Sequence, residues 1–186
     1  MNMSFDGLIS ALNNGQVDIL CSGMSATPER KESVDFSEPH TTSAVGVMVA
    51  RDSEWADATS LEDLSISIVA QKTSVLDDVI DQIPDVNHMS AVNTIPECIS
   101  RLTQGTVDAC TVDANDKDMY EETYPDYVVL LFEDGKGFET EGVDPAMAVA
   151  KGDPQGYLPV INQAIEGMGS DERRKLWDEA VERVPE

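Results

Sequence analysis

The sequence predicts an α/β protein built from two similar lobes, and an internal repeat is the main reason. Residues 9–18 (ISALNNGQVD) return as residues 99–108 (ISRLTQGTVD), so both copies read ISxLxxGxVD. Apolar residues three positions apart give each copy one apolar helix face, and the glycine supplies the left-handed residue that ends a helix. An apolar, strand-like run follows each copy. Chance recurrence of a common helix–glycine–strand junction is the alternative interpretation.

The first half of the chain begins with a predicted helix at about residues 5–14 and a strand at 17–22. Thr27 suits a helix N-cap and Pro28 the first helical turn, so a short helix is expected to start there. An extended turn at 36–39 precedes a buried strand at 44–50. Residues 51–60 are polar and are expected to form an irregular connection.

The second half continues the alternation of strands and helices, and this alternation along the whole chain favours parallel sheets covered by helices. Residues 133–141 are rich in glycine and acidic residues and are expected to form a loop. The strands are expected at 66–70, 86–89, 109–113, 128–132 and 146–150. The helices are expected at 74–83, 94–104, 115–122, 157–168 and 171–182.

Length and apolar content bound the class of protein. The chain has 186 residues, of which 41% are hydrophobic, enough for one sizeable domain or two small lobes. No apolar run approaches the roughly 20 residues of a membrane span, so we expect no membrane insertion. The chain as given starts without a basic region or an apolar signal segment, so we expect no export signal within it.

The net charge is strongly negative. The sequence has 36 acidic and 12 basic residues, for a formal net charge of −24. Nucleic acids and anionic membranes require basic patches, so this charge argues against both as partners. The acidic residues are dispersed along the chain, a pattern that fits a salt-rich, halophilic setting in which ions screen the repulsion. An ordinary acidic protein is the alternative.

The three cysteines, Cys21, Cys98 and Cys110, form no CxxC pair. Each lies on or beside an expected strand or helix, so we interpret them as small buried apolar residues. The chain's two histidines lie far from them in sequence, which argues against a cysteine nucleophile. We expect no catalytic residue, no metal site and no cofactor.

Candidate ligand-binding residues follow the two repeat copies, because open α/β sheets bind ligands beyond the carboxyl ends of their strands. The backbone N–H groups of Gly23, Met24 and Ser25, before the helix that begins near Thr27, favour an anion. Arg30 adds a planar fork that suits a carboxylate. Asp113 suits a cation, and the two charges together match a free amino acid. Arg30 could instead be a surface residue, and Asp113 could cap the next helix.

The same residues resemble a known family. Residues 5–12 (FDGLISAL), 23–30 (GMSATPER) and 34–39 (VDFSEP) are similar to the signature of family 3 extracellular solute-binding proteins, the polar amino acid receptors of ABC importers. In the second half, residues 71–74 (QKTS), 105–109 (GTVDA) and 148–154 (AVAKGDP) agree. The resemblance covers essentially the whole chain in order.

The resemblance implies a type 2 periplasmic-binding-protein-like fold that closes on its ligand by a hinge. Lobe 1 would comprise residues 1–48 and 138–186, and lobe 2 residues 49–137. Two crossing strands would join the lobes, near Val45–Val49 and at 136–141. Family members carry a further segment before the position of Phe5, so we expect this chain to be N-terminally truncated, with lobe 1 lacking its first strand–helix elements.

The resemblance also assigns roles to residues. Arg30 would take the α-carboxylate of the ligand, assisted by Ser25 and the backbone near Gly23 and Met24. Thr73 and Ser74 would assist from the other lobe, where Asp113 would take the α-ammonium group. Phe5 would stack on the ligand. Two positions depart from the family pattern: Lys72 stands where glycine is usual, and His40 where tyrosine is common.

The function that follows is the non-catalytic, extracytoplasmic binding of a free amino acid in the cleft between two lobes, for delivery to an ABC permease. Two alternatives remain on the same fold. One is an enzyme similar to cyclohexadienyl or arogenate dehydratases, which would need an acid–base group in the cleft. The other is a ligand-sensing domain of a signalling protein. The sequence does not identify which amino acid binds.

Overall fold

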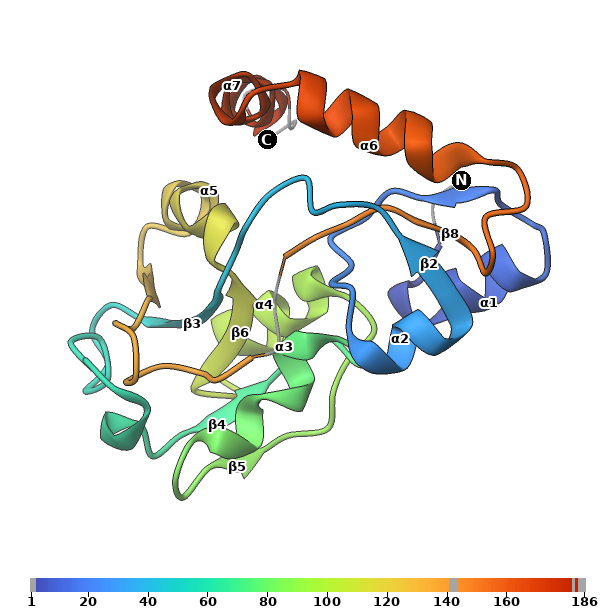
Figure 1. Ribbon diagram of the computed structural model, residues 1–186. Coiled ribbons are helices and arrows are strands. Elements are labelled where there is room, and N and C mark those ends of the chain that lie inside the picture. Colours follow the sequence, from blue (N-terminus) through green and yellow to red (C-terminus); the bar gives the residue numbers. More distant parts are fainter. Residues whose placement is uncertain (1–2, 141–143, 182, 184–186) are drawn as a thin grey trace. The chain divides into compact units, whose positions relative to one another are not determined.

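The computed structural model of the protein describes residues 3–140, 144–181 and 183 (Figure 1). The chain divides into two compact units. The first contains residues 7–42 and the chain from 144 onward, and the second contains residues 3–6 and 43–140. The boundaries between the units therefore lie at residues 6/7 and 42/43, and a third comes before residue 144, after the undescribed residues 141–143. The sequence analysis placed the lobe boundaries at 48/49 and 137/138.

The second unit is built on a five-stranded sheet of order β5-β4-β6-β3-β7. Its strands are β3 (Val45–Ala50), β4 (Ser67–Val69), β5 (Asn87–His88), β6 (Ala109–Asp113) and β7 (Tyr127–Leu130). Its helices are α3 (Val75–Asp78), α4 (Ile95–Thr103) and α5 (Lys117–Thr123), with 3-10 turns η2 (Leu61–Asp63), η3 (Ile80–Gln82) and η4 (Ala114–Asp116). Figure 1 shows β4, β6 and β3 side by side in this unit.

The expectation of parallel sheets is correct for only part of this sheet. Strands β5, β4 and β6 run parallel, and helical connections join them in the chain. Strand β3 instead pairs antiparallel with both β6 and β7. Such pairs need no crossover helix, and β3 enters the unit from the segment before it rather than through a strand–helix–strand connection.

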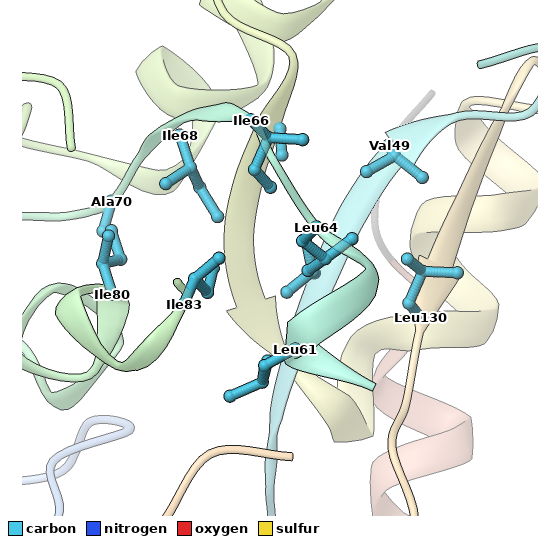
Figure 2. Close-up of a cluster of buried hydrophobic side chains, with 11 residues drawn as sticks. Val49, Leu61, Leu64, Ile66, Ile68, Ala70, Ile80, Ile83 and Leu130 are labelled. Atoms are coloured by element: carbon cyan, nitrogen blue, oxygen red, sulfur yellow. The ribbon is translucent and has the colours of Figure 1, made fainter. Parts of the chain in front are cut away.

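Both faces of this sheet are buried, as the continuous apolar run of β3 predicts. Val47 and Val49 lie in one cluster and Met48 in the other, because successive strand side chains point to opposite faces. Figure 2 shows the first cluster, in which side chains from η2 and η3 cover the sheet. On the other face, side chains of α4 and α5 pack against the sheet.

The first unit has a smaller sheet of order β1-β8-β2. Its strands are β1 (Ile19–Leu20), β2 (Val34–Phe36) and β8 (Ala148–Ala150), and β8 pairs antiparallel with both neighbours. Its helices are α1 (Leu8–Asn13), α2 (Pro28–Ser33), α6 (Tyr157–Gly167) and α7 (Ser170–Val181), with the 3-10 turn η1 (Phe5–Gly7) before α1. A parallel sheet was expected here too, and that expectation is wrong because β8 runs opposite to its two neighbours.

Some predicted elements differ from the observed ones. Strand β2 was not predicted, and of its residues only Phe36 was assigned, to the extended turn at 36–39. Its partner β8 lies more than a hundred residues later in the chain. The crossing strand expected at 136–141 is not observed in the described residues 136–140, which form turns and irregular structure. Residue 141, the end of that predicted strand and loop, and residue 182, the end of the last predicted helix, lie outside the described residues.

The two repeat copies end their helices with the same hydrogen bonds. After α1, the N–H of Gly15 donates to the Leu12 carbonyl at 3.0 Å, and that of Gln16 to Ala11 at 2.9 Å. After α4, Gly105 donates to Leu102 at 2.9 Å and Thr106 to Arg101 at 3.0 Å. This pair of bonds defines a Schellman cap, which requires a left-handed residue. Gly15 and Gly105 have φ of 67° and 68°, as the pattern predicts.

The strands that follow the two caps differ in their surroundings. In the second unit, β6 lies between β4 and β3, and Ala109 is fully buried. In the first unit, β1 is an edge strand among the described residues, and Ile19 is 39% exposed. Val160, Leu176 and Trp177, on α6 and α7, are also exposed apolar residues of this unit. Within the described part of the chain, no helix combines the length and the apolar character that crossing a membrane requires.

Candidate ligand-binding site

In the first unit, the loop after β1 is fixed by backbone contacts to the segment before β8. The Met24 carbonyl accepts a hydrogen bond from the Ala146 N–H at 3.0 Å, and Ser25 forms an isolated antiparallel bridge with Pro145. The Met24 side chain is only 1% exposed, so it anchors the loop in the core. Gly23, the residue before it, is exposed. The loop is thus held in place at Met24 and Ser25 and faces solvent at Gly23.

Helix α2 begins where the sequence predicts it. The Thr27 hydroxyl accepts a hydrogen bond from the Arg30 N–H at 3.3 Å, and Pro28 occupies the first helical turn. This cap fixes the first turn of α2, from which the Arg30 side chain projects. One guanidinium nitrogen of Arg30, Nη1, donates to the Ser25 carbonyl at 2.8 Å. The first unit therefore brings Arg30 together with the loop of Gly23, Met24 and Ser25, as the sequence predicts.

Ser22 is a residue of this loop that the sequence analysis did not select. Its hydroxyl oxygen is buried and has no hydrogen-bond partner among the described residues. Such atoms are rare in folded proteins, because an unpaired buried hydroxyl loses its bonds to water without replacement. Its position directly after β1, at the carboxyl end of a strand, was the available sequence signal.

In the second unit, the loop Gln71–Ser74 follows β4. The Lys72 N–H donates to the Val92 carbonyl at 2.8 Å, and the Ser74 hydroxyl donates to the Gln71 carbonyl at 2.5 Å. Thr73 has a φ of 58°, which is strained for a β-branched residue and costs about 1 to 3 kcal/mol. The strained position is thus Thr73 itself rather than Lys72, the departure noted in the sequence.

Asp113 ends β6, the parallel neighbour of β4, so the loop Gln71–Ser74 and Asp113 follow the carboxyl ends of adjacent strands. Asp113 Oδ1 accepts the Asn115 N–H at 2.8 Å and also a hydrogen bond from the Ser43 hydroxyl. The first of these bonds caps η4, which is the structural role that the sequence left open for Asp113. Both of these bonds fall on the same carboxylate oxygen.

Asp116, at the end of η4, is a second carboxylate near Asp113 that the sequence analysis did not select. Burial raises the pKa of Asp116 to about 6, and repulsion from Asp113 adds to this shift. The side chain of Asp116 is half-buried. The second unit therefore concentrates negative charge beyond the end of β6, which favours a cation there.

Phe5 belongs by its contacts to the second unit, within η1. Its neighbour Asp6 forms an ion pair with Lys72, with 2.6 Å between Oδ2 and Nζ. The Asp6 pKa is lowered, first by this hydrogen bond with Lys72 and then by one from Ser4. Thr73, Ser74 and Asp113 lie in the second unit, the lobe assigned to them from the sequence, whereas Phe5, which fell within the predicted lobe 1 (residues 1–48), also groups with the second unit.

Comparisons with known proteins identify the family of the chain. Residues 1–179 match the family described as bacterial extracellular solute-binding proteins, family 3. The chain is 31% identical over 165 residues to the glutamate-binding protein GluB of Corynebacterium glutamicum, an alignment that covers 86% of this chain and 54% of the relative. The chain thus spans about half the length of this curated relative.

Solved structures have the same fold. The crystal structure of the substrate-binding protein of an amino acid ABC transporter matches with a TM-score of 0.81 and 32% identity, over 96% of this chain and 77% of that one. An ancestral amino acid-binding protein, described as a precursor of cyclohexadienyl dehydratase, matches with a TM-score of 0.80 and 27% identity, over 96% and 75%. These matches confirm the type 2 periplasmic-binding-protein fold. The chain belongs to the family 3 bacterial extracellular solute-binding proteins.

Proposed function

We propose that the chain binds a free amino acid as the solute-binding component of an ABC importer. The observation that carries this proposal is the pair of opposite charges that follow the two strands β1 and β6. Arg30, on α2 of one unit, donates a hydrogen bond to the loop residue Ser25, and Asp113 ends a strand of the other unit. A free amino acid carries the two complementary charges on its α-carboxylate and α-ammonium groups.

Arg30 is the proposed receptor for the α-carboxylate. A guanidinium has five N–H donors in a planar fork, and Nη1 of Arg30 donates to the Ser25 carbonyl. That bond fixes the orientation of the plane before a ligand arrives, which lowers the entropic cost of binding. Gly23, Met24 and Ser25 add backbone N–H groups on the same loop. Charge-assisted hydrogen bonds of this kind contribute roughly 1.5 to 3 kcal/mol each.

Asp113 is the proposed receptor for the α-ammonium group. Its Oδ1 accepts hydrogen bonds from Ser43 and Asn115, which fix the carboxylate, and a carboxylate has about four acceptor positions in all. Oδ2 is the proposed contact for the ligand. Thr73 and Ser74 would assist from the neighbouring strand end, and Phe5 would stack on the ligand.

Titration calorimetry with each common amino acid tests this proposal, and Arg30→Ala is the decisive variant. We expect at least one amino acid to bind and Arg30→Ala to weaken it more than tenfold, whereas the matched control Arg174→Ala, on the exposed face of α7 in the same unit, leaves affinity unchanged. Full affinity in Arg30→Ala would contradict the assignment of the carboxylate.

Ligand analogues separate the roles of the two charges. In the unmodified protein, replacing the ligand's carboxylate by a carboxamide and replacing its α-ammonium by a hydroxyl should each reduce affinity. Arg30→Ala should remove only the first sensitivity, and Asp113→Asn only the second. Asparagine retains an oxygen that can accept the Asn115 N–H, so the η4 cap survives the change. Loss of both sensitivities in one variant would point to unfolding of the site instead.

A dehydratase activity is the second candidate, favoured by the similarity to the ancestral precursor of cyclohexadienyl dehydratase. Such a reaction needs a general acid or base, and Asp113 is the candidate on the proposed site, where the ligand ammonium would occupy it. We therefore expect the chain to bind without turnover. Consumption of prephenate or arogenate by the purified protein, lost in Asp113→Asn, would establish the enzyme instead.

The proposed partners and location follow from the family, whose description is extracellular. We propose an extracytoplasmic location and an ABC permease as the protein partner. Nucleic acid is not a proposed partner, because 36 acidic residues oppose 12 basic ones. Amino acid uptake by cells that lack the gene, with and without its reintroduction, measures the transport role.

A further inference from the structure

We propose that the Lys72–Asp6 ion pair is a clasp that positions Phe5 beside the loop Gln71–Ser74, and that this clasp supports ligand affinity. The inference rests on the proposed function, in which Phe5 stacks on the amino acid. It assigns Lys72 and Asp6 as positioning residues, which do not themselves contact the ligand. The family pattern does not supply this pair, because Lys72 stands where glycine is usual.

The first step of the argument is that Lys72 projects from a fixed backbone. Its N–H donates to the Val92 carbonyl at 2.8 Å, and Gln71 forms a parallel bridge with Val92. The Gln71 side chain also donates to the Asn93 carbonyl at 3.1 Å. The segment at Val92 and Asn93 therefore holds the backbone of the loop, so the Lys72 side chain extends from a fixed position.

The second step is that hydrogen bonds within the loop also hold its conformation. The Ser74 hydroxyl donates to the Gln71 carbonyl at 2.5 Å, and the Thr73 hydroxyl donates to the Lys72 carbonyl at 2.7 Å. Thr73 adopts a φ of 58°, which a loop retains only when its surroundings fix it. The residues assigned to the ligand and the residue that carries the ammonium thus belong to one fixed turn.

The third step concerns the other end of the pair. Asp6 is the middle residue of η1, directly after Phe5 and directly before Gly7, where the chain enters the first unit. Its Oδ2 lies 2.6 Å from Lys72 Nζ. Because Phe5 directly precedes Asp6, holding Asp6 against the loop also restricts the position of Phe5. The short 3-10 turn has no fully buried residue, and Phe5 itself is half-buried.

The fourth step is that the ammonium of Lys72 is already engaged in an ion pair before a ligand binds. It forms an ion pair with Asp6, and a direct ion pair with a ligand carboxylate would have to compete with that contact. The pair is partly exposed, with side chains 40% and 30% accessible, so added salt should weaken it. The clasp is therefore expected to contribute modestly and in a salt-dependent way.

Lys72→Met tests the clasp without a ligand. Hydrogen–deuterium exchange should become faster at amides 5–7 and 72–75 in this variant. Lys136→Met is the control, because it breaks a more exposed ion pair, with Glu133 in the same unit, and should leave both segments unchanged. Unchanged exchange at amides 5–7 in Lys72→Met would overturn the positioning role, whether or not any amino acid binds.

Calorimetry with the common amino acids as probes tests the effect on affinity. We expect Lys72→Met and Asp6→Asn each to weaken the bound amino acid by up to about fivefold at low salt, the double variant to be no weaker than either single one, and the charge swap Asp6→Lys with Lys72→Asp to recover affinity. Equal affinity in all variants, or additive losses, would overturn the inference while the Arg30 result still stands. If the unmodified protein binds none of the probes, the proposed function fails, and the exchange experiment alone decides the clasp.

Discussion

The carboxylate of Asp108 joins two strands of the second unit through Ser67. Asp108 Oδ2 accepts hydrogen bonds from the Ser67 N–H at 2.8 Å and from the Ser67 hydroxyl at 2.7 Å. Asp108 also donates its own N–H to the Ser67 carbonyl at 2.9 Å. Asp18 occupies the equivalent position of the first repeat copy, but it is exposed and its strand is an edge.

Replacing these two aspartates by alanine should therefore have unequal effects on stability. Asp108→Ala leaves the half-buried Ser67 N–H without its acceptor, and we expect a loss of about 1.5 to 3 kcal/mol in the free energy of unfolding. Asp18→Ala, the matched control, should cost about 0.5 kcal/mol or less. Urea unfolding followed by circular dichroism measures both. Equal losses would show that Asp18 has a partner of similar strength.

The two cap glycines should behave alike, because their caps share the same pair of hydrogen bonds. Gly15→Ala and Gly105→Ala each place a Cβ on a residue with φ near 67°, with no other atom within 4 Å of it. Only backbone strain is added, so we expect each change to cost about 1 to 2 kcal/mol. Glycine to asparagine, which tolerates this conformation better, should cost less. Urea midpoints that do not move would contradict the left-handed caps.

Thiol labelling should distinguish the three cysteines in the folded protein. Burial raises the pKa of Cys98 to about 12, and burial together with the neighbouring Cys98 raises that of Cys110 further. Only a thiolate reacts rapidly, so these two should be inert at pH 8, whereas exposed Cys21 should react. The expected count is therefore one reactive thiol in the folded protein, none in Cys21→Ser, and three in denaturant. More than one reactive thiol in the native protein would show that α4 opens away from β6.

This cysteine pattern illustrates what the sequence could predict. All three cysteines were interpreted as buried, and this holds for Cys98 and Cys110, but Cys21 is exposed. The local signals for both copies were the same, an apolar run after an ISxLxxGxVD phrase. What differs is the neighbouring strand: β4 covers one side of β6, whereas β1 has no equivalent neighbour among the described residues. Burial at that level depends on tertiary context, which a local pattern does not contain.

The same distinction applies to the sheets and to the site. Caps and helix starts were predictable because Thr27, Gly15 and Gly105 act within their own turn. The antiparallel place of β8 was not, because its partners β1 and β2 lie more than a hundred residues earlier. The clasp between Lys72 and Asp6 escaped the sequence for the same reason. The family resemblance supplied the correct fold, but not these contacts that are particular to this chain.

The half-buried carboxylate of Asp116 should make stability depend on pH in an unusual direction. Burial, assisted by repulsion from Asp113, raises its pKa from the ordinary 3.8 to about 6 in the folded protein. The folded state therefore binds this proton more tightly than the unfolded state does. The stabilisation that this proton gives the folded protein is complete below about pH 4 and is lost as the pH rises through 6.

Asp116→Asn, which resembles the protonated acid, should therefore stabilise the protein above pH 6. After allowance for solvent screening of a half-buried group, the expected gain at pH 8 is on the order of 1 kcal/mol. The gain should shrink below pH 6 and vanish near pH 4, because the native acid is then protonated as well. Asp118→Asn, an exposed change on the same segment, is the control and should show no such dependence. Urea midpoints measured from pH 4 to 8 give both curves. If Asp116→Asn proves destabilising at pH 8, the carboxylate is paired in the folded protein and its repulsion by Asp113 does not dominate.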